Sequence, residues 1–285
     1  LPTYESHNLR ILFMCDPPKE TDPNARASRL VGKLDFLEQV ARRFPQLGFF
    51  ELGNEPDLRF FYPGEIRDYV ADFEQMSAAV KRGNPNAFVM NGGLSFAGSE
   101  GIERSRELVE LTDPATLDGW AYHGHGVGMD AEKAAWERMD ALLQLYGKAG
   151  KPLVETESGM AARTRSQEDV QARTVVQKMV FAQSKKMPLF MWFRLLMFEE
   201  DYGSLRSEIE PRPVVLAFRS MVKSLRGFQF DRTVESLPTG THGFTFRNAT
   251  DGRACVLWSD SPQPRGLMFR LPGVHDTVVV RDLYG

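Results

Sequence analysis

The residues Phe49-Phe50-Glu51-Leu52-Gly53-Asn54-Glu55-Pro56-Asp57 indicate the fold class of this chain. Its apolar beginning is typical of a short buried strand. Pro56 has no N–H group and pushes the preceding residue out of the helical region, so the strand ends close to Glu55. Since α/β folds keep their active sites at the carboxyl ends of their strands, we expect Glu55 to lie in such a site.

A strand followed by a helix repeats on both sides of this stretch. Apolar runs of strand length alternate with runs whose apolar residues recur at helical spacing. Besides the stretch above, the predicted strands are 10–16, 87–90, 117–123, 151–157 and 188–194, and the predicted helices are 25–44, 65–81, 102–111, 131–146, 167–184 and 214–225. This alternation is the pattern of parallel βαβ units, which build either an open doubly wound sheet or a (β/α) barrel.

Helical periodicity disappears after residue 226. The rest of the chain holds short runs rich in β-branched and aromatic residues, separated by turns that contain glycine. The predicted strands there are 244–248, 254–260, 266–273 and 277–285. We therefore expect two domains, a (β/α) barrel catalytic domain over residues 1–226 and a small antiparallel, β-sandwich-like accessory domain over residues 227–285.

Composition indicates an ordinary globular protein. The chain has 285 residues, 42% of them hydrophobic and 26% charged, which is enough for one large core and a small appendage. Its net charge of −3 comes without a basic block, which argues against nucleic acid or an anionic membrane surface as a partner. No apolar run approaches the roughly 20 residues of a membrane span.

The two cysteines, Cys15 and Cys255, lie far apart in the sequence and in no metal-binding spacing. We expect two buried free thiols rather than a disulfide. The cysteines do not decide the compartment, and we expect a secreted or periplasmic location over a cytoplasmic one.

Polar and aromatic side chains follow the predicted strands at their carboxyl ends. In chain order they are Asp16, Asn54 with Glu55, Asn91, His123 with His125, Glu157, and Trp192 with Arg194. In a barrel these strand ends meet at one mouth. The sequence offers no serine in a Gly-x-Ser-x-Gly elbow, no phosphate-binding glycine loop and no Cys/His metal cluster that would compete with them.

Two glutamates at one mouth, Glu55 and Glu157, are the minimum equipment for cutting a glycosidic bond. One carboxyl group must deliver a proton to the leaving oxygen, and the other must stay ionised to attack the anomeric carbon. Asn54 and the two histidines are candidate hydrogen-bond donors to this pair, and Trp192 offers a flat apolar face for a sugar ring.

Four motifs occur in order along the chain: Asn54-Glu55-Pro56, a strand end at His123, the strand end Thr156-Glu157-Ser158-Gly159, and a final strand with Trp192. Together they resemble the clan A glycoside hydrolases, family 39 first and family 5 next, over residues 10–225. The resemblance implies a (β/α)8 TIM barrel followed by a β-domain. In such a barrel the acid/base ends the fourth strand and the nucleophile ends the seventh.

The resemblance also implies roles for the motif residues. Glu55 would be the general acid/base and Glu157 the nucleophile of a retaining double displacement on a β-linked glycan or glycoside. Asn54 would hydrogen-bond the sugar 2-hydroxyl. The expected partner is a carbohydrate substrate, and neither a cofactor nor a metal is expected.

Three aromatic-ring residues complete the predicted site. His123 matches a family histidine that lines the site, and Trp192 would form the floor of the glycone subsite. At the position of His125 the family usually carries a tyrosine that touches the nucleophile, so this sequence departs from the family pattern there.

The other glutamates near the motifs leave an alternative open. Glu155 and Glu157 lie two residues apart on one predicted strand, so strand alternation places them on the same face. We prefer Glu157 as the nucleophile because it ends the strand, whereas Glu155 would lie deeper in the barrel. By the same alternation Glu51 points inward below Glu55, and we interpret it as a partner in a structural ion pair.

Two other functions compete with a glycosidase. In a metal-dependent barrel hydrolase, His123 and His125 would hold a divalent cation together with a carboxylate. No further histidine lies at a predicted strand end to complete such a shell. The second alternative is a catalytically inactive carbohydrate-binding barrel, and the presence of both glutamates argues against it.

The predicted strands are too few for a closed barrel. A closed barrel of this class needs eight strands, and six are predicted before residue 227. If Glu55 ends the fourth strand and Glu157 the seventh, the first two strands precede Leu1. Six parallel strands would leave two unpaired edges, which is a liability in water. We therefore expect an N-terminal segment or a separate chain to supply the first two strands.

Overall fold

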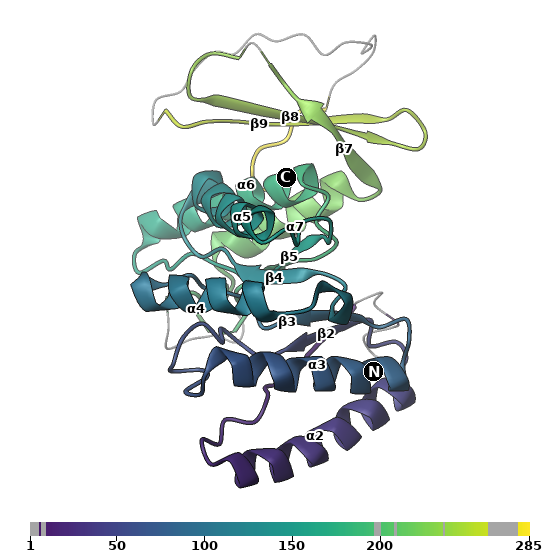
Figure 1. The fold of residues 1–285 in the computed structure, drawn as a ribbon. Coiled ribbons are helices and arrows are strands. Elements are labelled where there is room, and N and C mark those ends of the chain that lie inside the picture. Colours follow the sequence, from purple (N-terminus) through teal and green to yellow (C-terminus); the bar gives the residue numbers. More distant parts are fainter. Residues whose placement is uncertain (1–5, 7–9, 197–200, 208–209, 236, 262–278) are drawn as a thin grey trace. The chain divides into compact units, whose positions relative to one another are not determined.

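The computed structural model describes residues 6, 10–196, 201–207, 210–235, 237–261 and 279–285 (Figure 1). Contacts divide the chain into two compact units. The first unit is Leu1–Gly124, Ala134–Ser158 and Pro188–Met191, and the second is His125–Lys133, Gly159–Met187 and Trp192–Gly285. Each unit combines segments from different parts of the chain, so the domain boundary at residues 226 and 227 stays a prediction.

Six short strands form the sheets on which the first unit is built. They are β1 (Leu12–Met14), β2 (Phe49–Leu52), β3 (Phe88–Asn91), β4 (Trp120–His123), β5 (Leu153–Ser158) and β6 (Phe190–Trp192), whose last residue is grouped with the second unit. β1, β2 and β3 are neighbours in chain order and pair in parallel, β4 pairs with β5 in parallel, and β6 lies beside β5. Each strand overlaps one of the predicted runs, which confirms those predictions.

The two three-stranded sheets meet where β3 and β4 end. Leu94, just beyond β3, forms a parallel bridge with Tyr122, and the His123 amide donates to the Leu94 carbonyl oxygen at 2.9 Å. The Asn91 side chain accepts from the Ala121 amide at 2.9 Å and donates to the Ala121 carbonyl oxygen at 3.0 Å. The strands therefore follow chain order across the junction, as in a barrel wall, rather than reversing as in a doubly wound sheet. Asn91, predicted at the mouth, serves this junction instead.

Four helices and a short 3-10 helix follow the first strands. They are α2 (Pro23–Arg43), α3 (Ile66–Gly83), α4 (Gly98–Leu111), η1 (Pro114–Thr116) and α5 (Gly128–Leu145). α2 begins where the Asp22 side chain accepts from the Ala25 amide at 2.8 Å and a proline occupies the first turn, both of which favour a helix start. α2 packs against α3, which in turn packs on β2 and β3 (Figure 1).

An apolar layer lies between the strands of the first unit. One buried residue from each of four successive strands contributes to it: Phe49, Met90, Ala121 and Val154. Layers of this kind, with one side chain from each of several strands, fill the interior of (β/α) barrels. The polar strand ends therefore stand beyond a packed apolar layer.

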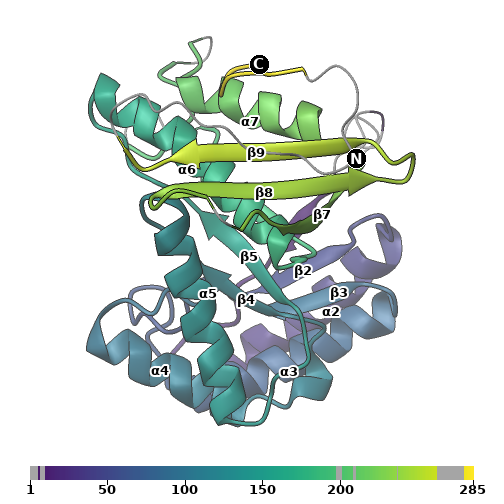
Figure 2. The same cartoon turned by 90° about the horizontal axis from the view of Figure 1, so that it is seen from above.

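The second unit combines two helices with an antiparallel sheet. Its elements are α6 (Arg165–Ser184), α7 (Pro213–Leu225), β7 (Phe228–Thr233), β8 (Thr241–Asn248) and β9 (Arg253–Ser259). The strands pair in the order β7-β8-β9 (Figure 2). Phe244 and Phe246 of β8 share a hydrophobic core with Val175 of α6 and Ala217 of α7. The predicted antiparallel sheet is present, and its core includes helices assigned by sequence to the barrel.

Two details of the β-region prediction need correction. The predicted strand 277–285 is wrong for its described part, because residues 279–285 contain no strand and Val279 and Val280 are largely exposed. β-branched residues favour a strand only when a neighbouring strand or apolar surface covers them. The predicted strand 266–273 lies outside the described residues. β7, which was not predicted individually, pairs with β8.

Two general predictions concern membranes and cysteines. Within the described part of the chain, no helix is long and apolar enough to cross a membrane. Cys15 and Cys255 are free thiols, as predicted, although both are half-buried rather than fully buried. Burial raises the pKa of both thiols, which makes them less reactive.

Candidate active site

A strained turn after β2 carries Glu55. The strand ends at Leu52, and the backbone then adopts a φ of 121° at Gly53 and 39° at Glu55. A positive φ is unusual for a residue with a side chain and costs about 1–3 kcal/mol, so it persists only where the surroundings enforce it. A Cβ on Gly53 would lie 3.0 Å from the Tyr69 ring, so glycine suits that position on both counts.

Two buried side chains hold this turn. The Tyr69 hydroxyl donates to the Leu52 carbonyl oxygen at 2.7 Å and accepts from the Gly92 amide at 2.9 Å, which links the ends of β2 and β3. The Asp57 carboxylate accepts from the Phe96 amide at 2.8 Å, and burial raises its pKa although hydrogen bonds oppose that effect. Sequence reasoning gave neither residue a role, because both act through backbone groups that are distant in sequence.

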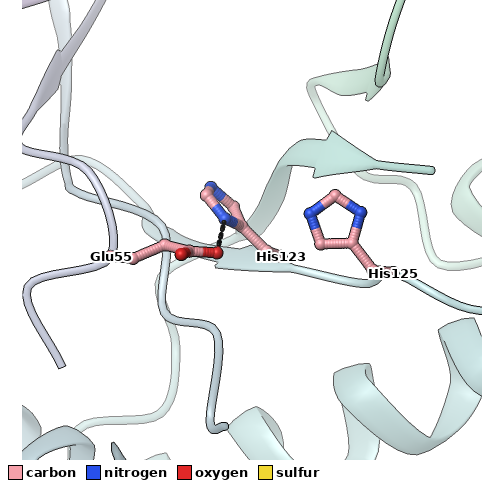
Figure 3. A group of neighbouring side chains, drawn as sticks. All are labelled: Glu55, His123 and His125. Carbon is pink, nitrogen blue, oxygen red and sulfur yellow. Dashed lines mark hydrogen bonds and ion pairs between the residues drawn. The ribbon is translucent and has the colours of Figure 1, made fainter. Parts of the chain in front are cut away.

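His123 is the centre of the site. It ends β4 and is buried, and its Nδ1 lies 2.8 Å from Glu55 Oε1 (Figure 3). The same nitrogen lies 3.9 Å from Glu157 Oε2, while Nε2 lies 3.9 Å from Glu51 Oε1. Three carboxylates, from β2, the turn after it and β5, therefore surround one imidazole. The two glutamates singled out by the sequence motifs meet at one nitrogen atom.

The carboxylates determine the charge of His123. Burial by itself disfavours the imidazolium, but Glu51, Glu55 and Glu157 outweigh burial and raise the pKa of His123 to about 10. At neutral pH the ring therefore carries a proton on both nitrogens and donates its Nδ1–H to Glu55. The site holds a fixed positive charge between its acidic groups.

Exposure separates the four glutamates of the site into two pairs. The side chains of Glu55 and Glu157 are 12% and 19% exposed, whereas Glu51 and Glu155 are almost completely buried. Only the first pair has carboxylate surface that a substrate could touch. Their two contacts with His123 Nδ1 also limit how far apart the nearer oxygens can lie. The separation of these two oxygens can therefore match that of retaining enzymes, about 5–5.5 Å. It can only just reach the lower end of the range for inverting enzymes, about 6.5–9.5 Å.

A register shift between β4 and β5 places Glu157. Tyr122 pairs with Glu155, but the next residue, His123, pairs with Glu157, so Thr156 is an extra residue in β5. The shift breaks the strict alternation on which the comparison of Glu155 with Glu157 rested. Glu155 accepts from the Tyr122 hydroxyl at 3.4 Å, whereas Glu157 lies at the histidine.

The other predicted site residues lie in two places. Asn54 belongs to the turn before Glu55, and its Oδ1 is buried without a hydrogen-bond partner among the described residues. His125 and Trp192 belong to the second unit. There the His125 ring meets Tyr202 edge-on at 5.5 Å, and Trp192 Nε1 donates to Ser204 Oγ at 3.2 Å. The predicted roles of His125 and Trp192 at the nucleophile and the glycone subsite stay predictions.

Coordination of a metal by the histidine pair is not favoured. His123 would have to offer a lone pair, but its Nδ1 already faces Glu55 at 2.8 Å. Because the pKa of His123 is raised to about 10, the ring is protonated on both nitrogens and has no lone pair to give at neutral pH. The donor set therefore fits an acid/base site better than a cation site.

No protein-family model matches this sequence, and a search of curated proteins finds no match. Solved structures do resemble it. A glucosidase from Croceicoccus marinus superposes with a TM-score of 0.63 at 16% identity, over 87% of this chain and 57% of that chain. The GH39 enzyme from Xanthomonas axonopodis pv. citri gives 0.56 at 16% identity, over 77% of this chain and 50% of that chain. This chain therefore shares its fold with these two enzymes.

A third structure extends the comparison to another family. Thermotoga maritima Cel5A, solved in complex with cellobiose, gives a TM-score of 0.52 at 13% identity, over 78% of this chain and 74% of that chain. At these identities the likeness concerns the fold alone. The chain spans about half the length of the first two structures.

Proposed function

We propose that this chain carries the catalytic site of a retaining O-glycoside hydrolase that acts on a β-linked glycan or glycoside. The main support is that the carboxylates of Glu55 and Glu157 are both partly exposed and both lie within 4 Å of Nδ1 of the buried His123. The barrel fold shared with solved glycosidases supports the same reaction class.

The proposed reaction has two steps. Glu157 attacks the anomeric carbon and forms a glycosyl ester, while the bond to the leaving oxygen breaks and Glu55 gives that oxygen its proton. In the second step Glu55 takes a proton from water, the water oxygen bonds to the anomeric carbon, and the ester bond to Glu157 breaks. Both enzyme carboxyl groups return to their starting states.

The neighbours of Glu55 suggest which oxygen carries the transferred proton. His123 donates to Oε1, so the proton that leaves for the substrate belongs on Oε2. A protonated Glu55 can keep the hydrogen bond through Oε1 and present Oε2–H to the leaving group. We assign the contact with a sugar hydroxyl to Asn54, whose side chain is half-buried in the turn beside Glu55.

A screen with aryl β-glycosides of xylose, glucose, mannose and glucuronic acid tests the proposal. On the substrate that reacts, Glu157→Gln should lower kcat at least about 1,000-fold. Glu155→Gln is the matched control, a buried glutamate on the same strand, and should keep activity. NMR of the first product should show the β-anomer.

Two outcomes would contradict the assignment. Full activity of Glu157→Gln would show that Glu157 is not the nucleophile. Loss of activity only in Glu155→Gln would assign that role to Glu155. Tight binding of a glycan without turnover by the unmodified protein would favour the carbohydrate-binding alternative.

We also propose that two further strands complete the barrel beside β1. Met14 on β1 is 46% exposed and Phe36 on α2 is 50% exposed, and exposed apolar side chains of this size suit coverage by further elements. The partner would be an N-terminal segment or a separate chain. A natural protein of only 32.2 kDa that is folded and monomeric would contradict this proposal.

A further inference from the structure

Glu51 is a buried glutamate that the two-step reaction does not use. It lies on β2, four positions before Glu55, and only 1% of its surface is exposed. Its Oε1 accepts from the Gly93 amide at 2.9 Å and from Thr156 Oγ1 at 2.7 Å. The same oxygen lies 3.9 Å from His123 Nε2, on the side of the ring away from Glu55.

Burial of the Glu51 carboxylate is unfavourable unless its neighbours replace the lost contacts with water. Moving a charged group out of water costs several kcal/mol unless hydrogen bonds and an opposite charge offset the loss. The Gly93 and Thr156 donors supply the hydrogen bonds, and the His123 imidazolium supplies the charge. Glu51 therefore stabilises the charged form of His123.

The backbone leaves the ring little freedom. A Cβ on Gly93 would lie 2.2 Å from His123 Nε2, so the glycine backbone packs directly against that edge of the imidazole. Glu51 reaches the same edge, and Glu55 binds the opposite nitrogen. The ring is thus held between two carboxylates, one on each side.

We propose that Glu51 is a positioning residue that acts through His123, holding the imidazole in place and keeping it charged between Glu55 and Glu157. The proposal rests on the proposed function, because it takes Glu55 and Glu157 as the catalytic pair. Glu51 itself stays covered by Gly93 and Thr156 and does not touch the substrate.

The charged groups around the ring come from two strands. Glu51 and Glu55 approach from β2 and the turn after it, and Glu157 approaches from β5. On β4 itself, the Tyr122 hydroxyl is directed to Glu155. Replacing Glu51 by glutamine keeps an oxygen acceptor for Gly93 and Thr156 but removes one of three negative charges, so the pKa of His123 should fall.

NMR of ¹⁵N-histidine-labelled protein measures this directly. In the unmodified protein both His123 nitrogens should stay protonated up to about pH 9, and in Glu51→Gln the titration midpoint should fall by at least one unit. Asp72→Asn, which replaces a buried carboxylate on α3 that pairs with Arg26, is the matched control and should leave the midpoint in place. With an active substrate, Glu51→Gln should lower kcat about tenfold and change KM less than twofold.

The outcomes separate the proposal from the proposed function. An unchanged His123 midpoint in folded Glu51→Gln overturns the positioning role, whatever the activity. If the unmodified protein cleaves no glycoside but the midpoint falls as expected, only the proposed function fails. If Glu51→Gln does not fold, Thr156→Val takes its place. That variant keeps the carboxylate and removes one of its hydrogen bonds, so the midpoint should stay or rise, and a fall would overturn the proposal.

Discussion

Replacing Gly93 by alanine should displace His123. A Cβ on Gly93 would lie 2.2 Å from both Cδ2 and Nε2 of His123 and 2.8 Å from Thr156 Oγ1. Carbon atoms in contact are normally about 3.5–4.0 Å apart, so the ring or the Gly93 backbone has to move by more than about 1 Å. The ring cannot turn away freely because its Nδ1 is bound to Glu55 at 2.8 Å.

The displacement has two expected costs. Forcing an extra methyl group into a packed interior typically costs about 1–3 kcal/mol of folding free energy. A shift of about 1 Å in a group that binds the acid/base also misaligns the reaction, which we expect to lower kcat/KM about 100-fold. Gly93→Ala should therefore lose both stability and activity.

Urea unfolding followed by circular dichroism, with kcat/KM on the aryl glycoside that reacts best, measures both effects. Gly48→Ala is the matched control, because Gly48 precedes β2 and a Cβ there meets nothing within 4 Å. The control should stay within about 0.5 kcal/mol of the unmodified protein. Unchanged stability and activity in Gly93→Ala would refute the packing described for His123.

Two further predictions concern the groups around the site. The folded-state pKa of His123, about 10, exceeds its ordinary value of 6.5, so its contribution to stability is complete below about pH 6.5 and is lost as the pH rises towards 10. The free energy of unfolding should fall by at most about 1.4 kcal/mol per pH unit over this range. Urea unfolding at several pH values should find no such fall in His123→Asn. The same fall in that variant would mean that another group causes it. Tyr69→Phe removes the hydroxyl that joins Leu52 to Gly92 and should cost about 1–3 kcal/mol in the same assay. A smaller change than about 0.5 kcal/mol would mean that the turn after β2 does not depend on this hydroxyl.

Much of the first unit could be predicted from the sequence, because its elements have clear local signals. Apolar runs of strand length gave the strands β1 to β6, and Pro45 follows soon after the end of α2. Pro56 correctly indicated that the strand ends close to Glu55, and β2 ends at Leu52. The convergence of Glu55 and Glu157 followed from a topological rule, since strand ends meet at one edge of parallel sheets.

The rest depended on departures from regular geometry. The left-handed backbone at Glu55 and the extra residue at Thr156 alter where side chains point, and no local pattern of residues announces either. The contact of Gly93 with His123 joins two different elements, so it too is invisible in one sequence. Glu51, interpreted as an inward-facing partner in an ion pair, lies 3.9 Å from His123, but the identity of that partner needed coordinates.

The second unit shows a different limit. The predicted strand 277–285 had the right composition, yet its described residues form no strand, and all of them except Leu283 are exposed. Strand propensity depends on what covers a segment, and the sequence does not say what does. The helices α6 and α7 were predicted correctly as helices, but their shared core with the β7-β8-β9 sheet is a matter of tertiary packing.

Trapping of the glycosyl ester would identify the nucleophile. The protein is incubated with a 2-deoxy-2-fluoro glycoside carrying a good leaving group, and the labelled peptide is located by mass spectrometry. The proposed double displacement predicts one glycosyl group, attached to Glu157. A label on Glu155, or no label together with a product of inverted configuration, would contradict the proposal.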